Sequence, residues 1–308
     1  MPQLLTIIGP TASGKTPVAA HLAHRMGGVV VSGDSRQVYR GMDLGTGKDL
    51  EDYVVDGERV PYYLIDIAEA GDHYSLFQYL EDFDQVWQSL PVETPRILCG
   101  GSGLYVEAAV RGYHLPDVPR DEQLREELGQ LSLDALRERA EQLGALEEVR
   151  DPENRRRMER AIEVALYFRD HGERYLDRPP LGGPIYCLDI SRETRRRRIS
   201  ERLDRRLLGG MVEEVEGLLQ HLRPEQLTYY GLEYRYVTDY VTGKLTYEEM
   251  RERLEVAIHQ FAKRQMTWIR GMERRGLTIT PIQPADTPAA TAELILHDYL
   301  HRRVWRGT

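Results

Sequence analysis

The chain has 308 residues, of which 41% are hydrophobic, 8% aromatic and 30% charged, with a formal net charge of −9. This is the composition of a globular protein with one large or two smaller domains, which excludes collagen-like, disordered and disulfide-rich classes. The sequence has no long uncharged apolar run and no signal-peptide pattern at the N-terminus, so we expect a cytoplasmic protein with no membrane segment. Its two cysteines, Cys99 and Cys187, both lie in apolar runs, so we expect two buried free thiols.

The first 115 residues alternate short apolar runs with helical patterns. Runs rich in β-branched residues predict buried strands at Leu4–Ile8, Val29–Ser32, Tyr62–Ile67 and Arg96–Cys99. Helical periodicity between them predicts helices such as Pro17–Met26 and Ser75–Leu90. This alternation predicts an α/β fold, in which a parallel sheet is flanked by helices.

The pattern changes after Leu115, where prolines interrupt the chain and a charged helical block begins. A Pro/Gly-rich segment at 178–184 follows this block, and Ile185–Ile190 predicts another buried strand. We therefore expect an all-helical domain, 116–182, inserted into an α/β core made of 1–115 and 183–308. The remainder reads as mostly helical, with a weakly patterned end after Thr278.

A phosphate-binding P-loop is the sharpest motif in the chain. The sequence GPTASGKT at 9–16 matches G-x-x-x-x-G-K-[ST] and lies between a predicted strand and a predicted helix. Backbone N–H groups, the helix N-terminus and the lysine charge would hold phosphate oxygens, and the threonine hydroxyl would hold Mg²⁺. The expected phosphate-binding residues are Gly9, Pro10, Thr11, Ala12, Ser13, Gly14, Lys15 and Thr16. The motif alone leaves ATP, GTP and an organic diphosphate open.

Two polar loops follow predicted strands and belong to the same edge of the sheet. Asp34, in SGDSRQVY at 32–39, is a candidate general base or a water-mediated Mg²⁺ ligand, although an Asx turn or helix cap is an equal alternative. Ser102, in CGGSGLY at 99–105, follows the fourth strand. Because ligands bind at the carboxyl ends of parallel strands, we expect both side chains beside the P-loop.

Positive charge is concentrated in one part of this acidic chain. Residues 151–210 hold fifteen Arg and eleven acidic residues, a charge of +4, so the rest of the chain carries −13. Basic helical segments occur at 155–160 and 195–206, and 262–270 interleaves cations with a tryptophan. Such segments suit phosphate tracking and base stacking along RNA, although a solvated helix face is the common alternative.

Together, these segments resemble the tRNA dimethylallyltransferases, also called tRNA isopentenyltransferases. The resemblance runs from Leu4 to about Arg275 and rests on seven segments in the family's order: 9–16, 34–39, 41–48, 64–67, 100–105, 160–164 and 262–270. The chain has no C-terminal zinc finger, unlike eukaryotic members, which indicates the bacterial type. The resemblance implies a P-loop NTPase-like core and a helical insertion that clamps the anticodon stem.

The resemblance also implies an activity. The family transfers a dimethylallyl group from dimethylallyl diphosphate to N6 of the adenine at tRNA position 37, immediately 3′ of the anticodon, in tRNAs that read codons beginning with U. The P-loop holds the diphosphate of the donor and Mg²⁺ assists. We expect a monomer, because one clamp and one site are present per chain.

By the same resemblance, Asp34 is the base on the adenine N6 amine and Arg202 meets the diphosphate. Ser102 stands where the family usually has threonine, so the hydroxyl is retained, and Thr16 is the residue expected at the metal. The implied tRNA contacts are Asp34, Ser35, Arg36, Gln37, Ser102, Arg125, Arg156, Arg157, Arg160, Lys263, Arg264, Gln265, Trp268 and Arg270.

One segment departs from the family, and other functions remain open. Where members commonly have a Gly-Tyr-Lys-like stretch, Tyr229–Arg235 reads YYGLEYR, so Leu232 and Glu233 weaken the expected RNA contacts there. An adenylate isopentenyltransferase would share the P-loop and the aspartate but would need no stem clamp. A small-molecule kinase would need a γ-phosphate site, for which Asp66 and Asp189 are candidate magnesium-side acids. The intact catalytic pattern argues against a non-catalytic RNA-binding protein.

Overall fold

The computed structural model describes residues 4–149 and 151–306. The chain divides into two compact units, one formed by Met1–Arg111 with Pro180–Thr308 and the other by Gly112–Pro179. The sequence predicts an insertion at 116–182, so its limits lie within four residues of those of the second unit.

The first unit is built on a six-stranded sheet of order β10-β9-β1-β6-β2-β5, in which every neighbouring pair is parallel. Its strands are β1 (Leu4–Ile8), β2 (Val29–Ser32), β5 (Tyr62–Tyr63), β6 (Arg96–Gly100), β9 (Ile185–Leu188) and β10 (Ile279–Ile282). The register pairs Ile8 with Gly100 and Ser32 with Cys99, which brings the carboxyl ends of β1, β6 and β2 to one edge. The predicted α/β fold with a parallel sheet is confirmed.

Two predicted strands are too long, and one strand was not predicted. The predicted strand Tyr62–Ile67 ends at Tyr63, because Leu64 and Asp66 take positive φ angles of 62° and 56° that break the extended run. The strand predicted to reach Ile190 ends at Leu188. Strand β10 was not predicted, since this edge strand is only partly buried and includes a proline.

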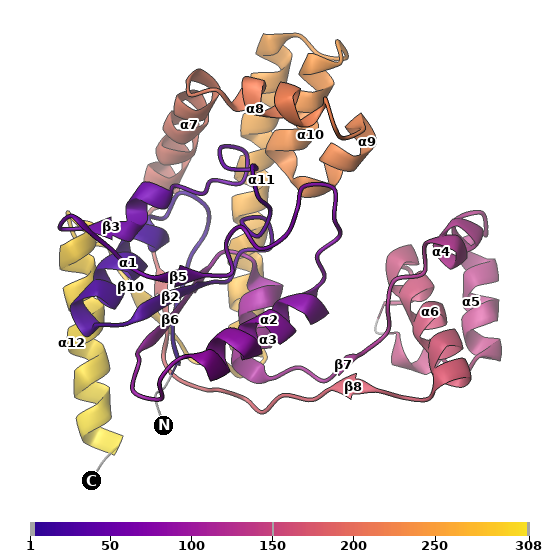
Figure 1. Ribbon diagram of the computed structural model, residues 1–308, viewed down its shortest axis with the longest axis horizontal. Coiled ribbons are helices and arrows are strands. Elements are labelled where there is room, and N and C mark those ends of the chain that lie inside the picture. The colour runs from indigo at the N-terminus through magenta and orange to yellow at the C-terminus, as the bar shows by residue number, and fades with distance from the viewer. Residues whose placement is uncertain (1–3, 150, 307–308) are drawn as a thin grey trace. The chain divides into compact units, whose positions relative to one another are not determined.

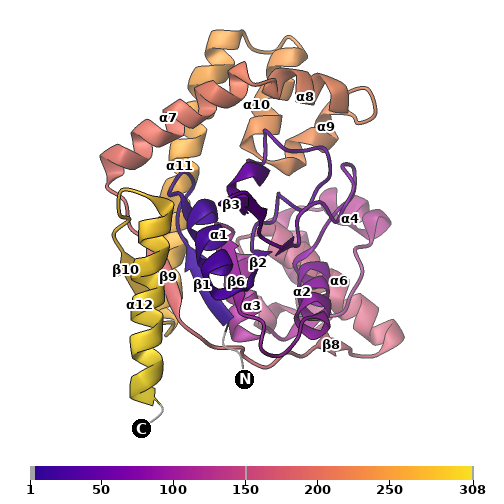
Figure 2. The ribbon, with the colours of Figure 1, turned by 60° about the vertical axis from the view of Figure 1, so that its left-hand side comes forward.

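Helices cover both faces of the sheet (Figure 1). Helices α1 (Lys15–Met26) and α12 (Pro288–Arg306) pack side by side on one face, as Figure 2 shows. Helices α2 (Leu76–Ser89) and α3 (Gly103–Arg111) pack on the other face, together with part of α11 (Tyr247–Arg274). This distribution follows from right-handed crossovers between parallel strands. Apolar residues of β1, β2, β6, α1 and α12 form the main core.

A group of helices follows β9 and stands at the carboxyl edge of the sheet. Helix α7 (Arg192–Leu208) begins at its cap Ser191 and packs on α11, which begins with a Thr246–Glu249 capping box. Between them lie α8 (Met211–Leu218), α9 (Pro224–Leu227), η3 (Thr228–Tyr230) and α10 (Leu232–Val241). The connection after β2 carries η1 (Leu50–Tyr53) and a short hairpin of β3 (Val54–Val55) and β4 (Glu58–Arg59).

The second unit is a small helical domain. Its helices are α4 (Glu122–Gly129), α5 (Leu133–Gln142), η2 (Leu146–Glu148) and α6 (Arg155–His171). They enclose a core of Leu128, Leu136, Ala140, Met158 and Ile162. The prediction of an all-helical insertion needs a correction, because β7 (Leu115–Pro116) and β8 (Tyr175–Leu176) pair antiparallel where the chain enters and leaves the unit.

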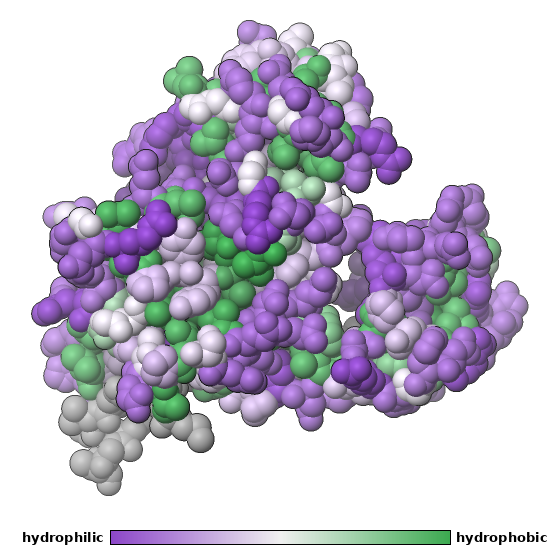
Figure 3. Space-filling view, in the orientation of Figure 1, coloured by the Kyte–Doolittle hydropathy of each residue, from purple (hydrophilic) through white to green (hydrophobic). Residues whose placement is uncertain are grey.

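Hydrophilic side chains dominate the visible surface, with hydrophobic ones gathered near the centre of the first unit (Figure 3). In the described parts of the chain, no helix is both long enough and apolar enough to cross a membrane. Cys99 and Cys187 are both free and buried, as predicted.

Candidate active site

A cavity of about 920 Å³ opens within the first unit, at the carboxyl edge of the sheet. Its walls come from the P-loop, the loops after β2 and β6, helices α7 and α11, and the segment from η3 to α10. This is the edge at which α/β sheets bind ligands. The volume lies near the upper end for small-molecule sites, so it has room for more than a diphosphate alone.

The P-loop adopts a strained turn that presents the start of α1 to the cavity. Ala12 and Gly14 take positive φ angles of 61° and 84°, and Gly14 caps α1 without a side-chain hydrogen bond. The first N–H groups of α1 therefore have no helical partner and face a site suited to an anion. Of the predicted residues, Thr11, Ala12, Gly14, Lys15 and Thr16 line the cavity.

The other predicted P-loop residues, Gly9, Pro10 and Ser13, are buried and shape the loop instead. A Cβ at Gly9 would lie 2.6 Å from Ser13 Oγ and 3.3 Å from Ser13 Cβ, so a larger residue there would displace the Ser13 side chain. Ser13 N–H donates to the Pro10 carbonyl at 3.2 Å, which closes the turn.

Lys15 lies half-buried in the lining of the cavity, at the start of α1. Burial lowers the pKa of Lys15, the nearby Arg202 and Arg206 lower it further, and Asp34 and Cys99 oppose the shift. A bound anion would favour the charged ammonium and reverse this effect.

Helix α7 supplies a row of arginines at a spacing of four residues. Arg198 Nη1 lies 3.5 Å from the Ser13 carbonyl, and Arg202 Nη2 donates to Asp49 Oδ2 at 2.7 Å. Arg206 Nη2 is 3.6 Å from the same Asp49 oxygen. All three arginines line the cavity, one turn apart on a single face of α7.

Arg206 is the least satisfied of these arginines. Its Nε and Nη2 are buried and have no hydrogen-bond partner in the described structure. Burial, with the neighbouring Arg202 charge, lowers the pKa of Arg206 to about 10. The sequence singles out Arg202 and treats Arg198 and Arg206 only as part of a basic segment. Their four-residue spacing was the signal that could have assigned them to the phosphate site.

Asp34 and Ser102 lie at the same edge, as predicted from their strands. Asp34 Oδ1 accepts from the Arg36 N–H at 2.9 Å, so the Asx turn is real, and the carboxylate also lines the cavity. Ser102 Oγ accepts from the Ser35 N–H at 3.0 Å and lies 3.2 Å from Ser35 Oγ. Asp34 and Ser102 thus both line the cavity that holds the P-loop residues.

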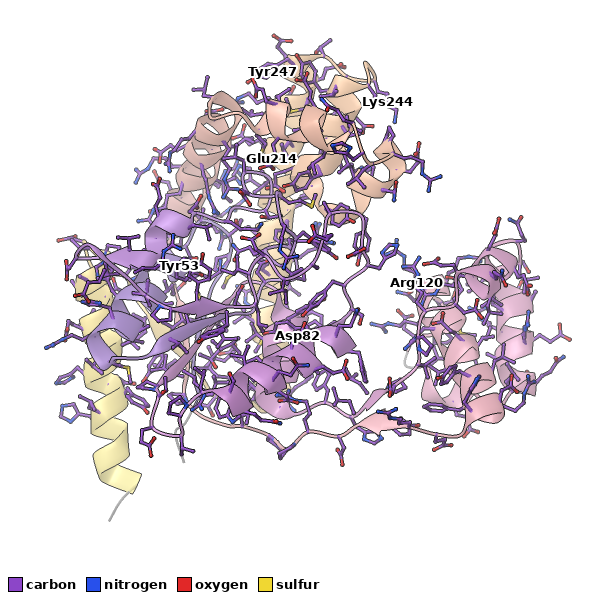
Figure 4. All side chains as sticks on the ribbon, viewed as in Figure 1. Tyr53, Asp82, Arg120, Glu214, Lys244 and Tyr247 are labelled. Carbon is purple, nitrogen blue, oxygen red and sulfur yellow. The ribbon has the colours of Figure 1, made fainter. Side chains whose placement is uncertain are left out.

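The long loop after β2 is held in place by a carboxylate of α8. Glu214, labelled in Figure 4, accepts from the N–H groups of Asp43, Leu44 and Gly45 at 2.9, 2.8 and 3.0 Å. It also accepts from the Tyr234 hydroxyl at 2.6 Å. Residues 41–48, which carry part of the family resemblance, therefore anchor the loop from which Asp34 projects.

Lys48 ties the same loop to the end of β5. Its Nζ is fully buried and pairs with Asp43 Oδ1 at 2.8 Å and with Asp66. Neither Asp66 nor Asp189 is among the residues that line the cavity. The two acids considered for a kinase metal site therefore lie outside it.

Aromatic and aliphatic side chains form part of the cavity lining, which we call the aromatic wall. Leu104, Tyr229, Phe261 and Trp268 line the cavity and remain 37–40% exposed. The Arg36 guanidinium lies 4.9 Å from the centre of the Tyr229 ring. Exposed aromatic faces beside arginines are suited to stacking with bases.

The predicted tRNA contacts of α11 divide into two groups. Arg264, Gln265 and Trp268 line the cavity, whereas Lys263 and Arg270 are exposed on α11 and are not part of its lining. The cavity also includes Ser35, Arg36 and Gln37, together with Leu232 and Glu233 of the segment that departs from the family. Burial raises the pKa of Glu233, and the positive charge of Arg206 offsets part of this rise.

In the second unit, two predicted tRNA contacts are occupied by an internal carboxylate. Glu163 accepts from Arg125 Nη2 at 2.8 Å and from Arg160 Nη1 at 2.5 Å. Arg156 and Arg157 are exposed, with Arg157 3.6 Å from Asp151. Contact of these four arginines with RNA stays a prediction.

The cavity lining offers a hydroxyl oxygen for a metal ion at Thr16. Within the described residues, no group of three or more His, Cys, Asp or Glu side chains could hold a metal. Mg²⁺ commonly uses one or two protein oxygens together with substrate phosphates and water. The Thr16 hydroxyl, at the start of α1 and on the cavity wall, fits that mode.

Comparison with known proteins gives a consistent result. A family model described as IPP transferase matches residues 37–272. A tRNA dimethylallyltransferase 1 from Porphyromonas gingivalis is 51% identical over 288 residues, covering 92% of this chain and 95% of its own. A tRNA dimethylallyltransferase 2 from Phocaeicola vulgatus is 52% identical over 283 residues, covering 90% of this chain and 91% of its own.

Solved structures agree with these sequence matches. The tRNA isopentenylpyrophosphate transferase of Bacillus halodurans is 28% identical with a TM-score of 0.70, over 100% of both chains. A eukaryotic dimethylallyltransferase acting on tRNA is 19% identical with a TM-score of 0.74, over 98% of this chain and 80% of that chain. At this identity the second comparison supports the fold alone.

Proposed function

Because the chain belongs to the IPP transferase family, we propose that it transfers a dimethylallyl group from dimethylallyl diphosphate to tRNA. The acceptor is N6 of adenine 37, 3′ of the anticodon, in tRNAs that read codons beginning with U. One observation carries this assignment: a single cavity holds the cationic phosphate site, the Asp34 carboxylate and the Ser102 hydroxyl. Neither the free-adenylate enzyme nor the kinase is supported by the relatives.

We assign the diphosphate group of the donor to the positively charged part of the cavity. Lys15, the N–H groups at the start of α1 and the α7 arginines would bind the diphosphate and stabilise its charge as it leaves. Mg²⁺ bound at the Thr16 hydroxyl would neutralise part of that charge. The allylic C–O bond breaks readily, since the developing carbocation is delocalised.

We assign the acceptor adenine to the part of the cavity lined by Asp34 and the aromatic wall. The N6 nitrogen forms a bond to the allylic carbon, the C–O bond breaks, and Asp34 accepts the N6 proton. Ser102 would orient the amine. The base must leave its stack to reach the cavity, and ring faces such as Tyr229 and Trp268 would replace part of the lost stacking. Exclusion of water would protect the allyl group from hydrolysis.

Two further properties belong to this proposal. We include a cytoplasmic monomer in this proposal, because a single chain lines the active-site cavity and both thiols are free and buried. The exposed arginines of α6 are the natural candidates to contact the anticodon stem.

The test is a transfer assay with radiolabelled dimethylallyl diphosphate and Mg²⁺. Unmodified tRNA that reads U-initial codons and AMP are offered in parallel, using wild type and Asp34→Asn. Asp56→Asn, the same change at an exposed turn outside the cavity, is the matched control. We expect label in tRNA, retained by Asp56→Asn and reduced at least about a hundredfold in Asp34→Asn, as for loss of a general base. Label in AMP alone, or phosphate transfer from ATP, would overturn the proposal.

A further inference from the structure

One side chain of α11 joins the two glycine-rich loops of the active site. Gln265 Oε1 accepts from the Thr11 N–H at 2.8 Å, and Gln265 Nε2 donates to the Gly101 carbonyl at 2.9 Å. Thr11 belongs to the P-loop after β1, and Gly101 follows β6. Gln265 thus bonds to the backbone at the ends of two neighbouring strands.

The fit around this amide is close. A Cβ at position 101 would lie 2.7 Å from Gln265 Nε2 and 3.4 Å from Lys15 Nζ. Glycine at this position therefore lets the amide and the lysine ammonium both approach the loop. The same helix face approaches the loop again one turn later, because a Cβ at Gly103 would overlap the Trp268 ring.

The chemistry of the two bonds fixes the orientation of the amide. The oxygen must face the Thr11 N–H and the nitrogen must face the Gly101 carbonyl, so a reversed amide would lose both bonds. The Thr11 N–H is consumed within the protein, which leaves the N–H groups at the start of α1 for the anion.

The bridge also reaches the acceptor half of the site. Ser102 follows Gly101 directly, and its hydroxyl accepts from the Ser35 N–H beside Asp34. A shift of the loop after β6 would therefore move Ser102 relative to both the P-loop and Asp34. Gln265 thus links the P-loop to the loop that carries Ser102.

We propose that Gln265 is a positioning residue, which holds the P-loop and the Ser102 loop at the spacing that the reaction needs, and that it is not itself a tRNA contact. The role of Gln265 in catalysis rests on the proposed function, whereas its effect on anion binding can be measured without tRNA. It replaces the expectation that Gln265 contacts tRNA directly.

The experiment compares Gln265→Met and Gln265→Glu with the same two changes at Gln260, an exposed residue of α11 outside this cavity. Inorganic pyrophosphate with Mg²⁺ is titrated calorimetrically, tRNA binding is measured by filter retention, and kcat and KM for dimethylallyl diphosphate are determined. Thermal melting reports whether each variant folds.

We expect Gln265→Met to weaken pyrophosphate binding about tenfold, since a partly buried N–H and a partly buried carbonyl both lose their partner. We expect kcat to fall as well, with the dissociation constant for tRNA unchanged. Gln265→Glu keeps the acceptor for Thr11 but places a carboxylate against the Gly101 carbonyl. Its anion binding should therefore be weaker still and should depend more steeply on salt. The Gln260 variants should match wild type.

A rise in the tRNA dissociation constant, with pyrophosphate binding unchanged, would overturn the inference, because Gln265 would then be an RNA contact. No change in either constant, or equal loss of both, would also overturn it. If one variant does not fold, the other decides by the same criteria. Failure of the wild type to prenylate tRNA, with the expected pyrophosphate results, would refute the proposed function alone.

Discussion

Arg206 gives the sharpest prediction, because the same side chain should destabilise the fold and strengthen ligand binding. Its side chain is 11% exposed, and two of its nitrogens are buried without a hydrogen-bond partner in the described structure. Burial lowers its pKa from 12.5 to about 10, which at 1.36 kcal/mol per pKa unit disfavours the folded state by about 3 kcal/mol at most. At neutral pH the Arg206 guanidinium is protonated in both the folded and the unfolded state, so the full free-energy penalty on folding is present. It fades only as the pH rises from about 10 towards 12.5.

The change to test is Arg206→Met, which keeps the aliphatic stem and removes the charge. We expect the free energy of unfolding, measured in urea without ligand, to rise by about 1–3 kcal/mol. We expect pyrophosphate affinity to fall by about 10- to 100-fold, because hydrogen bonds to charged groups contribute about 1.5–3 kcal/mol. Arg197→Met, at an exposed position of α7, is the matched control and should change neither quantity. A destabilised Arg206→Met protein with normal pyrophosphate affinity would refute this reasoning and make Arg206 a structural residue.

Three further changes test other parts of the structure. Asp49→Asn removes the carboxylate that pairs with the α7 arginines, so calorimetry should show pyrophosphate bound about 5-fold more tightly, in line with about 1 kcal/mol for exposed pairs; weaker binding would contradict this. Burial and then Asp49 raise the pKa of Asp52 to about 6, so its charge appears as the pH rises from 5 to 7 and should weaken pyrophosphate binding. Asp52→Asn should lose that part of the pH dependence, and identical profiles would exclude Asp52. Glu163→Gln leaves the Arg125 and Arg160 guanidinium groups without their carboxylate and should destabilise the second unit by about 3 kcal/mol; unchanged proteolytic resistance of 112–179 would count against this.

The sequence by itself determined those features that depend on residues close to one another along the chain. Strands β1, β2 and β6 are mostly apolar runs whose residues are all buried, so their pattern alone predicted a covered parallel sheet. The P-loop was equally predictable, because β1, the turn and α1 follow one another directly. Asp34 and Ser102 could be brought together in advance, since each follows a strand whose carboxyl end reaches the same edge.

Tertiary structure alone decided which polar side chains belong to the site and which serve the fold. Gln265 and Thr11 are 254 residues apart, and Arg202 and Asp49 are 153 apart, so no local pattern links them. The family resemblance implied tRNA contacts at Arg125 and Arg160, and only the structure shows that Glu163 also pairs with both inside the insertion. The physical reason is that hydrogen bonds and ion pairs join side chains by distance in space. Periodicity along a chain reports only which face of an element is buried.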